Sequence, residues 1–323
     1  MKRFARRSKD SASPSLRCAN AMSGPIFFCL CMSPAVDATV RLDAWPKPGE
    51  VLTVADESLN AGGKGLNVAR WLAIRGANVR CGGLLGRSGA APFEREMERF
   101  GIEDCFVRIN GETRRNEMFV SPEGAFKANR QAFPELSSLP CPTDRFLDGA
   151  DDGCVAILSG RLPKCAPASF YAEATALLKK RGAVVALDAT GEALRLGAAA
   201  GPDYAKPNAT ECAAVTGFEP RDAESFIRAT EVLRGAGIRH PILSDGASGA
   251  WFDGSFAPAP HVEAFDTTAA GDTLLAEWCW RRHGMGASPE EAARWAVAAG
   301  SAACTTPGGT PPPQSLVARL ASA

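Results

Sequence analysis

The sequence carries no net charge, few aromatic residues and no long apolar run. Its 36 lysine and arginine residues equal its 36 aspartate and glutamate residues, so the overall charge favours neither nucleic acid nor a membrane surface as a partner. The best apolar run, residues 25–32, is much shorter than the roughly 20 residues that a membrane span requires. Aromatics at 7% and 32 glycines predict a soluble, turn-rich enzyme rather than a collagen-like or disordered chain.

Cysteine is abundant but has no pattern. The 11 cysteines are scattered, odd in number and free of any C-x-x-C pair, which argues against a zinc site or a disulfide framework. Several lie in apolar runs, where a free cysteine behaves as a small hydrophobic residue. We therefore expect a reducing, cytoplasmic environment.

The zero charge is a balance between two unequal parts of the chain. Residues 1–23 contain six basic residues and one acidic residue, which puts this tail at +5 and the remainder at −5. Such a start resembles an organelle transit peptide. Because Met22 stands immediately before the first strand-like run, we favour a disordered or over-extended start and expect the folded domain to span residues 24–323.

Apolar runs alternate with helical patterns along residues 24–323. Strands are predicted at residues 26–32, 79–85, 155–159, 183–188, 204–207 and 241–244. Helices are predicted at residues 65–74, 93–100, 167–180, 223–234, 269–283 and 289–304. This alternation predicts an α/β domain with a doubly wound, mostly parallel sheet and helices on both faces.

Two segments, residues 38–59 and 105–130, interrupt that alternation. Both contain short alternating runs between turns, with strands predicted at residues 40–42, 50–55, 106–109, 117–121 and 125–129. Together they predict a small antiparallel sheet that projects from the core. Such a sheet could be a lid over a site or a dimer contact.

Residues 60–67 form a glycine-rich turn that leads into a predicted helix. The glycines permit close backbone approach and a helix N-terminus favours anionic groups, so Lys64 and Asn67 could face a hydroxylated or phosphorylated ligand. The run is not a Walker A loop, because glycine follows the lysine, and the chain has no G-x-G-x-x-G dinucleotide fingerprint. A tight turn before a packed helix explains the pattern equally well.

Residues 266–272 open a second helix with small residues. The N–H groups of Ala270, Gly271 and Asp272 could bind a phosphoryl group in transfer, and the Asp272 carboxylate could accept a hydroxyl proton. The alternative is that Asp272 only caps the helix.

Three other groups have both a structural and a functional interpretation. Asn208 and Glu211 have the spacing of a capping box, but they could equally orient waters around Mg²⁺. Residues 244–249 could form a hairpin turn or a nucleotide-phosphate loop, and the turn is favoured. Arg114 and Arg115 are either solvated charges or a phosphate clamp.

The order of these motifs resembles that of the PfkB (ribokinase-like) family of carbohydrate kinases, in the branch of 1-phosphofructokinases, tagatose-6-phosphate kinases and the minor 6-phosphofructokinase. Eight motifs match in family order over residues 25–313: Ser33-Pro-Ala-Val-Asp37, Ala61-Gly-Gly-Lys-Gly-Leu-Asn67, Thr113-Arg-Arg-Asn116, Ser159-Gly-Arg-Leu-Pro163, Asp188-Ala-Thr-Gly-Glu-Ala-Leu194, Lys206-Pro-Asn-x-x-Glu211, Ser244-Asp-Gly-Ala-Ser-Gly-Ala250 and Ala269-Ala-Gly-Asp272.

The resemblance implies a role for each matching residue. The sugar phosphate would be held by Asp37, Gly62, Gly63, Lys64, Asn67, Arg114, Asn116 and Arg161. The ATP side would be formed by Lys206, Asn208, Ser244, Gly246 and Gly249. Ala269, Ala270 and Gly271 would form the anion hole for the γ-phosphate, with Asp272 as the general base. Mg²⁺ would be held through water by Asn208 and Glu211, Asp266 and Thr268 are candidates for a K⁺ site, and the projecting sheet would clasp a homodimer.

Several positions depart from the family pattern. Ser33 replaces the usual Asn, Ala269 replaces the first Gly of G-A-G-D, and Arg161 stands where a small residue is common. Arg87 and Ser88 occupy a place where acidic or amide residues are usual. The methyl of Ala269 matters little unless its φ is positive. Arg161 either adds a contact to an anionic substrate or crowds the pocket.

We therefore expect an ATP- and Mg²⁺-dependent kinase for a hydroxymethyl group of a ketohexose monophosphate, with fructose 1-phosphate the first choice. Fructose 6-phosphate, tagatose 6-phosphate, an unphosphorylated sugar and a nucleoside are the alternatives, and Arg114 argues against the neutral ones. A non-catalytic sugar-phosphate or nucleotide sensor is a hypothesis from another class, against which the presence of Asp272 counts. A dinucleotide-dependent oxidoreductase is weakened by the missing fingerprint.

Overall fold

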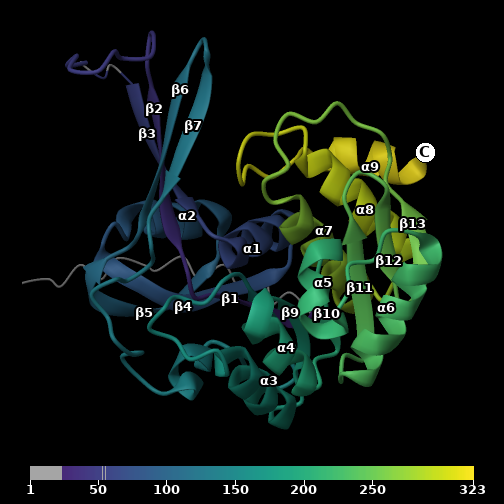
Figure 1. Ribbon diagram of the computed structural model, residues 1–323. Helices are drawn as coiled ribbons and strands as arrows, with labels where there is room; N and C mark the ends of the chain where they lie inside the picture. The colour runs from purple at the N-terminus through teal and green to yellow at the C-terminus, as the bar shows by residue number, and fades with distance from the viewer. Residues whose placement is uncertain (1–23, 53, 55) are drawn as a thin grey trace, which may run out of the picture.

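The computed structural model describes residues 24–52, 54 and 56–323, so the predicted tail at residues 1–23 lies outside the described residues. Its centre is a sheet in the order β13-β12-β11-β10-β9-β8-β1-β4-β5 (Figure 1). The strands are β1 (Ile26–Cys31), β4 (Asn78–Ser88), β5 (Glu103–Glu112), β8 (Val155–Ser159), β9 (Val184–Asp188), β10 (Tyr204–Ala205), β11 (His240–Asp245), β12 (Gly249–Phe252) and β13 (Ser255–Pro258).

The sheet is parallel from β5 to β11 and ends in an antiparallel hairpin, β12 and β13. The sequences of β8, VAILS, and β9, VVALD, are almost continuously apolar and buried. A strand covered by helices on both faces requires this pattern, because neither face meets water. The predicted doubly wound, mostly parallel sheet is confirmed.

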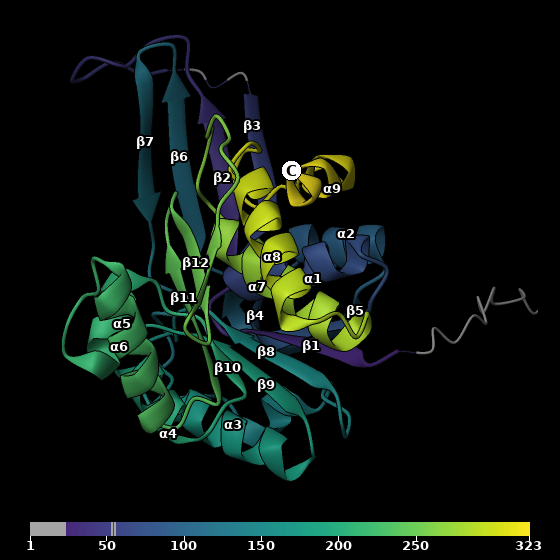
Figure 2. The same cartoon turned by 90° about the vertical axis from the view of Figure 1, so that its right-hand side faces the viewer.

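Helices cover both faces of the sheet (Figure 2). One layer contains α1 (Lys64–Ile74), α2 (Ala91–Phe100), α7 (Ala270–Cys279), α8 (Pro289–Ala303) and α9 (Gln314–Ser322). The other contains α3 (Phe170–Lys180), α4 (Gly191–Ala199), α5 (Ala209–Thr216) and α6 (Ala223–Gly235). The helix predicted at residues 269–283 is shorter than expected, because α7 gives way to a π-helical turn at Trp280–Gly284. No helix of the described chain is both long enough and apolar enough to cross a bilayer.

The strand order reverses at β1, which has β4 on one side and β8 on the other. In open α/β sheets, ligands bind in the crevice that such a reversal opens at the carboxyl ends of the strands. The fold therefore places the candidate site where β1, β8 and β9 end.

The small sheet, which we term the lid, has the order β3-β2-β6-β7 and stands away from the core in Figure 1. Its strands are β2 (Ala35–Arg41), β3 (Asp56–Gly62), β6 (Arg115–Ser121) and β7 (Gly124–Asn129). The lid is mixed rather than antiparallel, because β2 pairs in parallel with β6. In the chain, β2 follows β1 and β6 comes next after β5. Because β1 and β5 are parallel, both end on the carboxyl side of the main sheet, so β2 and β6 leave it in the same direction.

Two strand predictions for the lid are wrong. Among residues 50–55, the described ones form no strand, while 53 and 55 lie outside the described residues. The strand that pairs with β2 is β3, whose sequence DESLNAG contains no β-branched residue and so gave no strand signal. Residues 106–109 belong to β5, the edge strand of the main sheet, because they pair in parallel with β4.

Candidate active site

The starts of α1 and α7 meet the end of β9 at the predicted edge of the sheet. Lys64 is the first residue of α1, Asp272 is the third residue of α7, and Asp188 is the last residue of β9. Lys64 Nζ lies 3.1 Å from Asp188 Oδ1, and Asn67 Nδ2 donates to Asp272 Oδ2 at 2.8 Å. The structure thus joins two motifs that are about 200 residues apart.

Two hydrogen bonds between α1 and α7 set the relative position of these helices. The first is the bond from Asn67 to Asp272, and one turn further along Trp71 Nε1 donates to Glu277 Oε2 at 2.8 Å. Glu277 is fully buried, and its other oxygen accepts from Arg281 Nε at 2.8 Å. A buried carboxylate with several donors holds a defined geometry, because any displacement leaves a charge unpaired.

Asp272 is a buried carboxyl group with a strongly perturbed pKa. Burial, followed by the negative charge of Asp188, raises the pKa of Asp272 to about 6, although Lys64, Asn67 and Lys206 act in the opposite direction. The group is therefore ionised at neutral pH but more basic than an ordinary aspartate. This combination suits a general base, whose pKa works best near the operating pH.

Asp188 was missed as a site residue, although the motif that it begins was recognised. Its carboxylate is fully buried between two lysines, since Lys206 Nζ also lies 3.7 Å from Asp188 Oδ1. Burial alone would lower the pKa of Lys64, but the charges of Asp188, Asp272 and Glu211 raise it above its ordinary value. An aspartate that directly ends a buried parallel strand was the available signal.

The first turn of α7 contains the predicted anion hole. Its N-cap residue, Ala269, has φ 64° and ψ 1°, a left-handed conformation that disfavours a side chain. The methyl of Ala269 was expected to matter little unless φ is positive. Because φ is positive here, Ala269 is strained at a position where the family has glycine. At Gly271 a Cβ atom would stand 2.9 Å from Lys206 Nζ, so glycine allows this lysine to reach the helix start.

Asp37 and Asn116 face each other across the parallel pair of β2 and β6. Asn116 Nδ2 donates to Asp37 Oδ1 at 2.8 Å. Gly62 lies against the other carboxylate oxygen, because a Cβ atom there would come within 2.0 Å of Asp37 Oδ2. Gly63 caps α1 with φ 129°. The predicted sugar-hydroxyl residues are thus gathered where the lid joins α1.

Arg114 lies beside this pair and donates to three oxygens. Its Nε and Nη2 reach the Pro34 and Ser33 carbonyls and its Nη1 reaches Asn116 Oδ1, each at 3.2 Å. Burial lowers the pKa of Arg114, and the charge of Arg161 acts in the same direction, while the charge of Asp37 acts in the opposite one. Among the described residues, neither arginine has a carboxylate within 4.0 Å.

Arg115, in contrast, already has carboxylate partners within the lid. It pairs with Glu57 on β3 and lies 3.5 Å from Glu117 on its own strand. Its charge is neutralised within the lid, which favours Arg114 over Arg115 as the contact for an anionic ligand.

On the predicted nucleotide side, the structural interpretations are confirmed. Asn208 and Glu211 form a capping box, with Glu211 N donating to Asn208 Oδ1 at 2.7 Å and Asn208 N donating to Glu211 Oε2 at 3.1 Å. Ser244, Gly246 and Gly249 belong to the β11–β12 hairpin. Ser244 N donates to the Pro207 carbonyl at 3.1 Å, so the two segments lie next to each other.

Asp266 ties two loops together. Its Oδ1 accepts from Thr268 N and its Oδ2 accepts from Gly308 N, both at 2.8 Å. Although burial raises the pKa of Asp266, these bonds lower it below its ordinary value. The carboxylate is thus used by the backbone, and the role of Asp266 and Thr268 in binding K⁺ stays a prediction.

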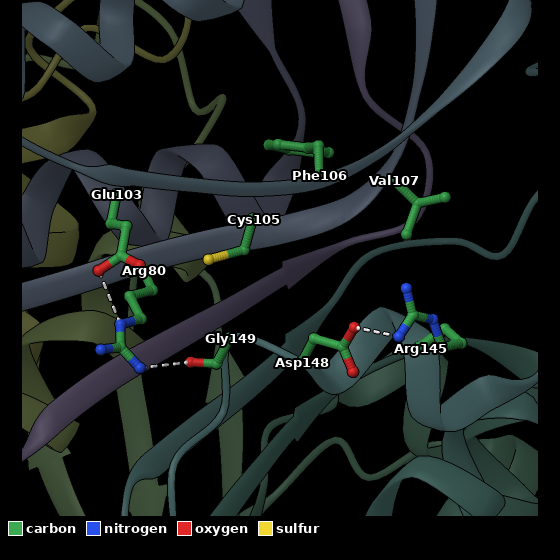
Figure 3. A pocket seen from close by; sticks show the side chains of 8 residues that line it. All are labelled: Arg80, Glu103, Cys105, Phe106, Val107, Arg145, Asp148 and Gly149. Atoms are coloured by element: carbon green, nitrogen blue, oxygen red, sulfur yellow. Dashed lines mark hydrogen bonds and ion pairs between the residues drawn. The ribbon is translucent and has the colours of Figure 1, made fainter.

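A hollow of about 410 Å³ lies elsewhere, at the amino ends of β4 and β5 (Figure 3). Its charges are paired within it, Arg80 with Glu103 at 2.9 Å and Arg145 with Asp148 at 3.1 Å. The amino ends of parallel strands lie at the edge opposite Asp188. This hollow therefore belongs to a different part of the molecule from the Lys64–Asp272 cluster.

Comparison with known proteins agrees with the motifs. The pattern of the pfkB family of carbohydrate kinases matches residues 30–315. A 1-phosphofructokinase of Rhodobacter capsulatus is 35% identical over 257 residues, which are 76% of this chain and 80% of the relative. A 1-phosphofructokinase of Vibrio cholerae serotype O1 is 31% identical over 286 residues, which are 86% and 89% of the two chains.

Solved structures share the fold. Phosphofructokinase-2 from Escherichia coli in complex with potassium superposes with a TM-score of 0.83 at 22% identity, covering 93% of this chain and 98% of that one. Ribokinase from Arabidopsis thaliana complexed with ribose and ATP gives a TM-score of 0.71 at 23% identity, covering 94% and 100%. The predicted ribokinase-like fold is confirmed.

Proposed function

Because the chain belongs to the pfkB family of carbohydrate kinases, and is therefore a phosphotransferase that acts on a sugar hydroxyl, we propose that its acceptor is a ketohexose monophosphate. Fructose 1-phosphate is the first choice, and the transfer goes from the γ-phosphate of ATP to a hydroxymethyl group. Fructose 6-phosphate and tagatose 6-phosphate are the alternatives.

The observation that carries this proposal is the pair of arginines beside the sugar residues. Arg114 is partly buried and bonded to neutral oxygens, and the exposed Arg161 is near enough for its charge to lower the pKa of Arg114. Neither arginine has a carboxylate within 4.0 Å among the described residues, although Asp37 is near enough for its charge to raise the pKa of Arg114. A phosphate monoester of charge near −2 would pair directly with both cations. A neutral sugar would leave both guanidinium groups without a direct ion pair.

The remaining residues would supply the transfer. Asp272 would accept the proton of the attacking hydroxyl while the first N–H groups of α7 bind the γ-phosphate. Lys64 and Lys206, held by Asp188, would stabilise negative charge on the phosphates. Transfer of this kind depends on positioning and charge stabilisation, which these buried groups provide.

Metal binding would be indirect. The described residues contain no cluster of three or more His, Cys, Asp or Glu side chains arranged to hold a metal. This fits Mg²⁺, which retains several waters and takes ligands from substrate phosphates. Asn208 and Glu211 would orient those waters, and the ion would neutralise phosphate charge. Asp266 and Thr268 remain the proposed K⁺ site.

A homodimer through the lid is part of the same proposal. Several large apolar side chains of the lid and its loops are exposed: Val51, Leu52, Val54, Leu59, Met118 and Phe126. Phe126 stacks on Phe119 and yet remains 55% exposed, so a second copy would bury both rings. The proposal also places the enzyme in a reducing cytoplasm, where the ten cysteines of the described residues remain free thiols.

The decisive experiment is a turnover screen with ATP and Mg²⁺ over fructose 1-phosphate, fructose 6-phosphate, tagatose 6-phosphate, the free sugars and a nucleoside. We expect the largest kcat/KM with fructose 1-phosphate. A larger kcat/KM with a free sugar or a nucleoside would contradict the role of the arginine pair. Binding of a sugar phosphate without turnover of any substrate would indicate a sensor instead.

A further inference from the structure

A continuous chain of polar contacts leads from the surface of α2 to Asp272. Glu96 on α2 accepts from Arg70 Nε at 2.7 Å, and Arg70 Nη1 donates to Asn67 Oδ1 at 3.3 Å. Asn67 Nδ2 then donates to Asp272 Oδ2 at 2.8 Å. Arg70 follows Asn67 by three residues on α1, so both side chains lie on the same face of the helix. None of the motifs assigned Arg70 a role.

The hydrogen-bond donors in this series of contacts determine the orientation of the Asn67 carboxamide. A carboxamide has an accepting oxygen at one end and a donating NH₂ group at the other, and a guanidinium can only donate. If Asn67 Oδ1 faces Arg70, the NH₂ group must face Asp272. In the reverse orientation, two donors would face each other at one end and two acceptors at the other.

Arg70 is itself held in place by its surroundings. It is only 5% exposed, and its Nη2 donates to the Ala61 carbonyl at 2.6 Å. Gly309 covers the Asn67 carboxamide from outside, because a Cβ atom there would lie 2.3 Å from Asn67 Oδ1 and 3.3 Å from Arg70 Nη1. The carboxamide is therefore confined on both sides.

We propose that Arg70 is a positioning residue for the catalytic base: it holds the Asn67 carboxamide in the orientation that presents an N–H group to Asp272. The proposal rests on the proposed function only through the role of Asp272 as base. Arg70 touches neither substrate nor reacting atoms in this scheme, and acts through Asn67.

The consequence is a dependence of Asp272 ionisation on Arg70. The N–H group of Asn67 favours the ionised carboxylate, and an inverted carboxamide would turn its oxygen toward that charge. The other charged groups that face Asp272 are Asp188 from β9, Lys64 from α1 and Lys206 after β10. The titratable groups around Arg70 are Glu96 from α2, Asp37 from β2 and Cys81 from β4.

The test compares Arg70→Met, which keeps an apolar stem of similar length, with Arg70→Lys, which restores a donor. The readout is the pH profile of kcat at saturating substrate. We expect the acid limb of Arg70→Met to move upward by about one pH unit, the equivalent of one charge-assisted hydrogen bond, so that kcat is about twofold lower at pH 7 and about tenfold lower near pH 5. Arg70→Lys should recover at least half of the shift.

The matched control is Arg99→Gln. Arg99 Nη1 also approaches Glu96, at 3.5 Å from Oε1, but it does not contact Asn67. Its loss should leave the acid limb unchanged. An acid limb for Arg70→Met that coincides with that of the wild type would overturn the proposal, as would an equal shift in Arg99→Gln.

Two further variants address the case in which Arg70→Met does not fold, since that change leaves Glu96 with only the longer contact to Arg99. Arg70→Met combined with Glu96→Gln removes both charges. Gly309→Ala displaces the Asn67 carboxamide without changing any charge, and it should also raise the acid limb. A folded double variant, or a folded Gly309→Ala variant, with the wild-type acid limb would equally refute the proposal.

A second readout separates this proposal from the proposed function. The ¹³C carboxyl signal of Asp272, identified by its absence in Asp272→Asn, can be titrated without substrate. We expect its midpoint to rise in Arg70→Met and not in Arg99→Gln. If the wild type phosphorylates none of the sugars, the function fails while this titration still decides the role of Arg70.

Discussion

The two halves of the site differ in whether their charged side chains are paired with one another. At the centre, Lys64 is bonded to Asp188 and Asn67 to Asp272, and both carboxylates are buried. At the junction with the lid, Arg114 is bonded to neutral oxygens, and its guanidinium has no carboxylate within 4.0 Å among the described residues.

This difference separates catalysis from recognition. Groups that stabilise a transition state work best when folding has already oriented them, because no reorganisation is then needed during reaction. A group that recognises an anion gains most when its charge is left for the ligand. We therefore expect changes at the centre to lower kcat, and changes at the lid to raise KM.

The largest effect should follow Asp272→Asn. The substitution removes the proton acceptor while keeping the shape of the side chain, so kcat should fall by a factor on the order of 10²–10⁴. Steady-state kinetics at pH 8 measures the loss, and calorimetric titration of ATP should give nearly the wild-type affinity.

The control for this loss is Asp253→Asn. Asp253 pairs with Arg234 at the other end of β11 and should leave kcat unchanged. Wild-type turnover in Asp272→Asn would remove Asp272 from the role of base and assign the proton to another group.

A smaller effect is expected from Arg114→Gln. Loss of a charge-assisted contact to the substrate phosphate should raise KM for the sugar phosphate by roughly 10- to 100-fold and change kcat much less. The increase should shrink at high salt, because screening weakens the wild-type attraction.

Arg115→Gln offers the matched comparison at the next position of the chain. Its charge is already paired with Glu57 and Glu117, so KM should stay within a factor of about two. Equal effects of the two substitutions would show that general lid charge, rather than the Arg114 contact, binds the substrate.

The pH dependence of the wild type tests the centre without mutation. Because the pKa of Asp272 is raised to about 6, the base becomes protonated as pH falls through 6. Turnover should therefore be level above about pH 7 and fall about tenfold per unit below 6. The substrate phosphate also titrates near pH 6, so kcat is measured at saturating substrate. A profile that stays level down to pH 5 would mean that Asp272 has an ordinary pKa.

The residues of both halves could be predicted to different extents from the sequence. Motif order identified Lys64, Asn67 and Asp272, since glycine-rich turns before helices leave a local pattern. Arg70 acts through contacts with distant segments, which have no local pattern, and the one local signal for Asp188 was its position at the end of an apolar strand. Their roles depend on the parallel register of β9 and on the packing of α1 against α2 and α7.

The lid was predicted less well for a related reason. Its existence followed from turn residues, but β3 has an exposed, polar sequence whose strand conformation comes from pairing with β2. The parallel pairing of β2 with β6 places Asp37 opposite Asn116. This pairing arises because both segments leave the main sheet on the side where its parallel strands end. Neither property is written in the segments themselves.

The smallest effect concerns strain at the centre. Ala269 has a left-handed backbone with φ 64°, which costs an L-residue roughly 1–2 kcal/mol, whereas glycine adopts it freely. Glycine also gains entropy in the unfolded chain, which offsets about 0.4–1 kcal/mol. Ala269→Gly should therefore increase the free energy of unfolding by up to about 1 kcal/mol, measured by urea denaturation.

Ala270→Gly is the matched comparison, because the next residue lies inside α7 and is not among the described residues with positive φ. The same change there should decrease the free energy of unfolding by about 0.5–1 kcal/mol, since glycine is a poor helix residue. An increase in the free energy of unfolding for Ala269→Gly, together with a decrease for Ala270→Gly, would locate the strain at the helix cap. A decrease at both positions would mean that α7 begins earlier than Ala270 and that Ala269 carries no strain.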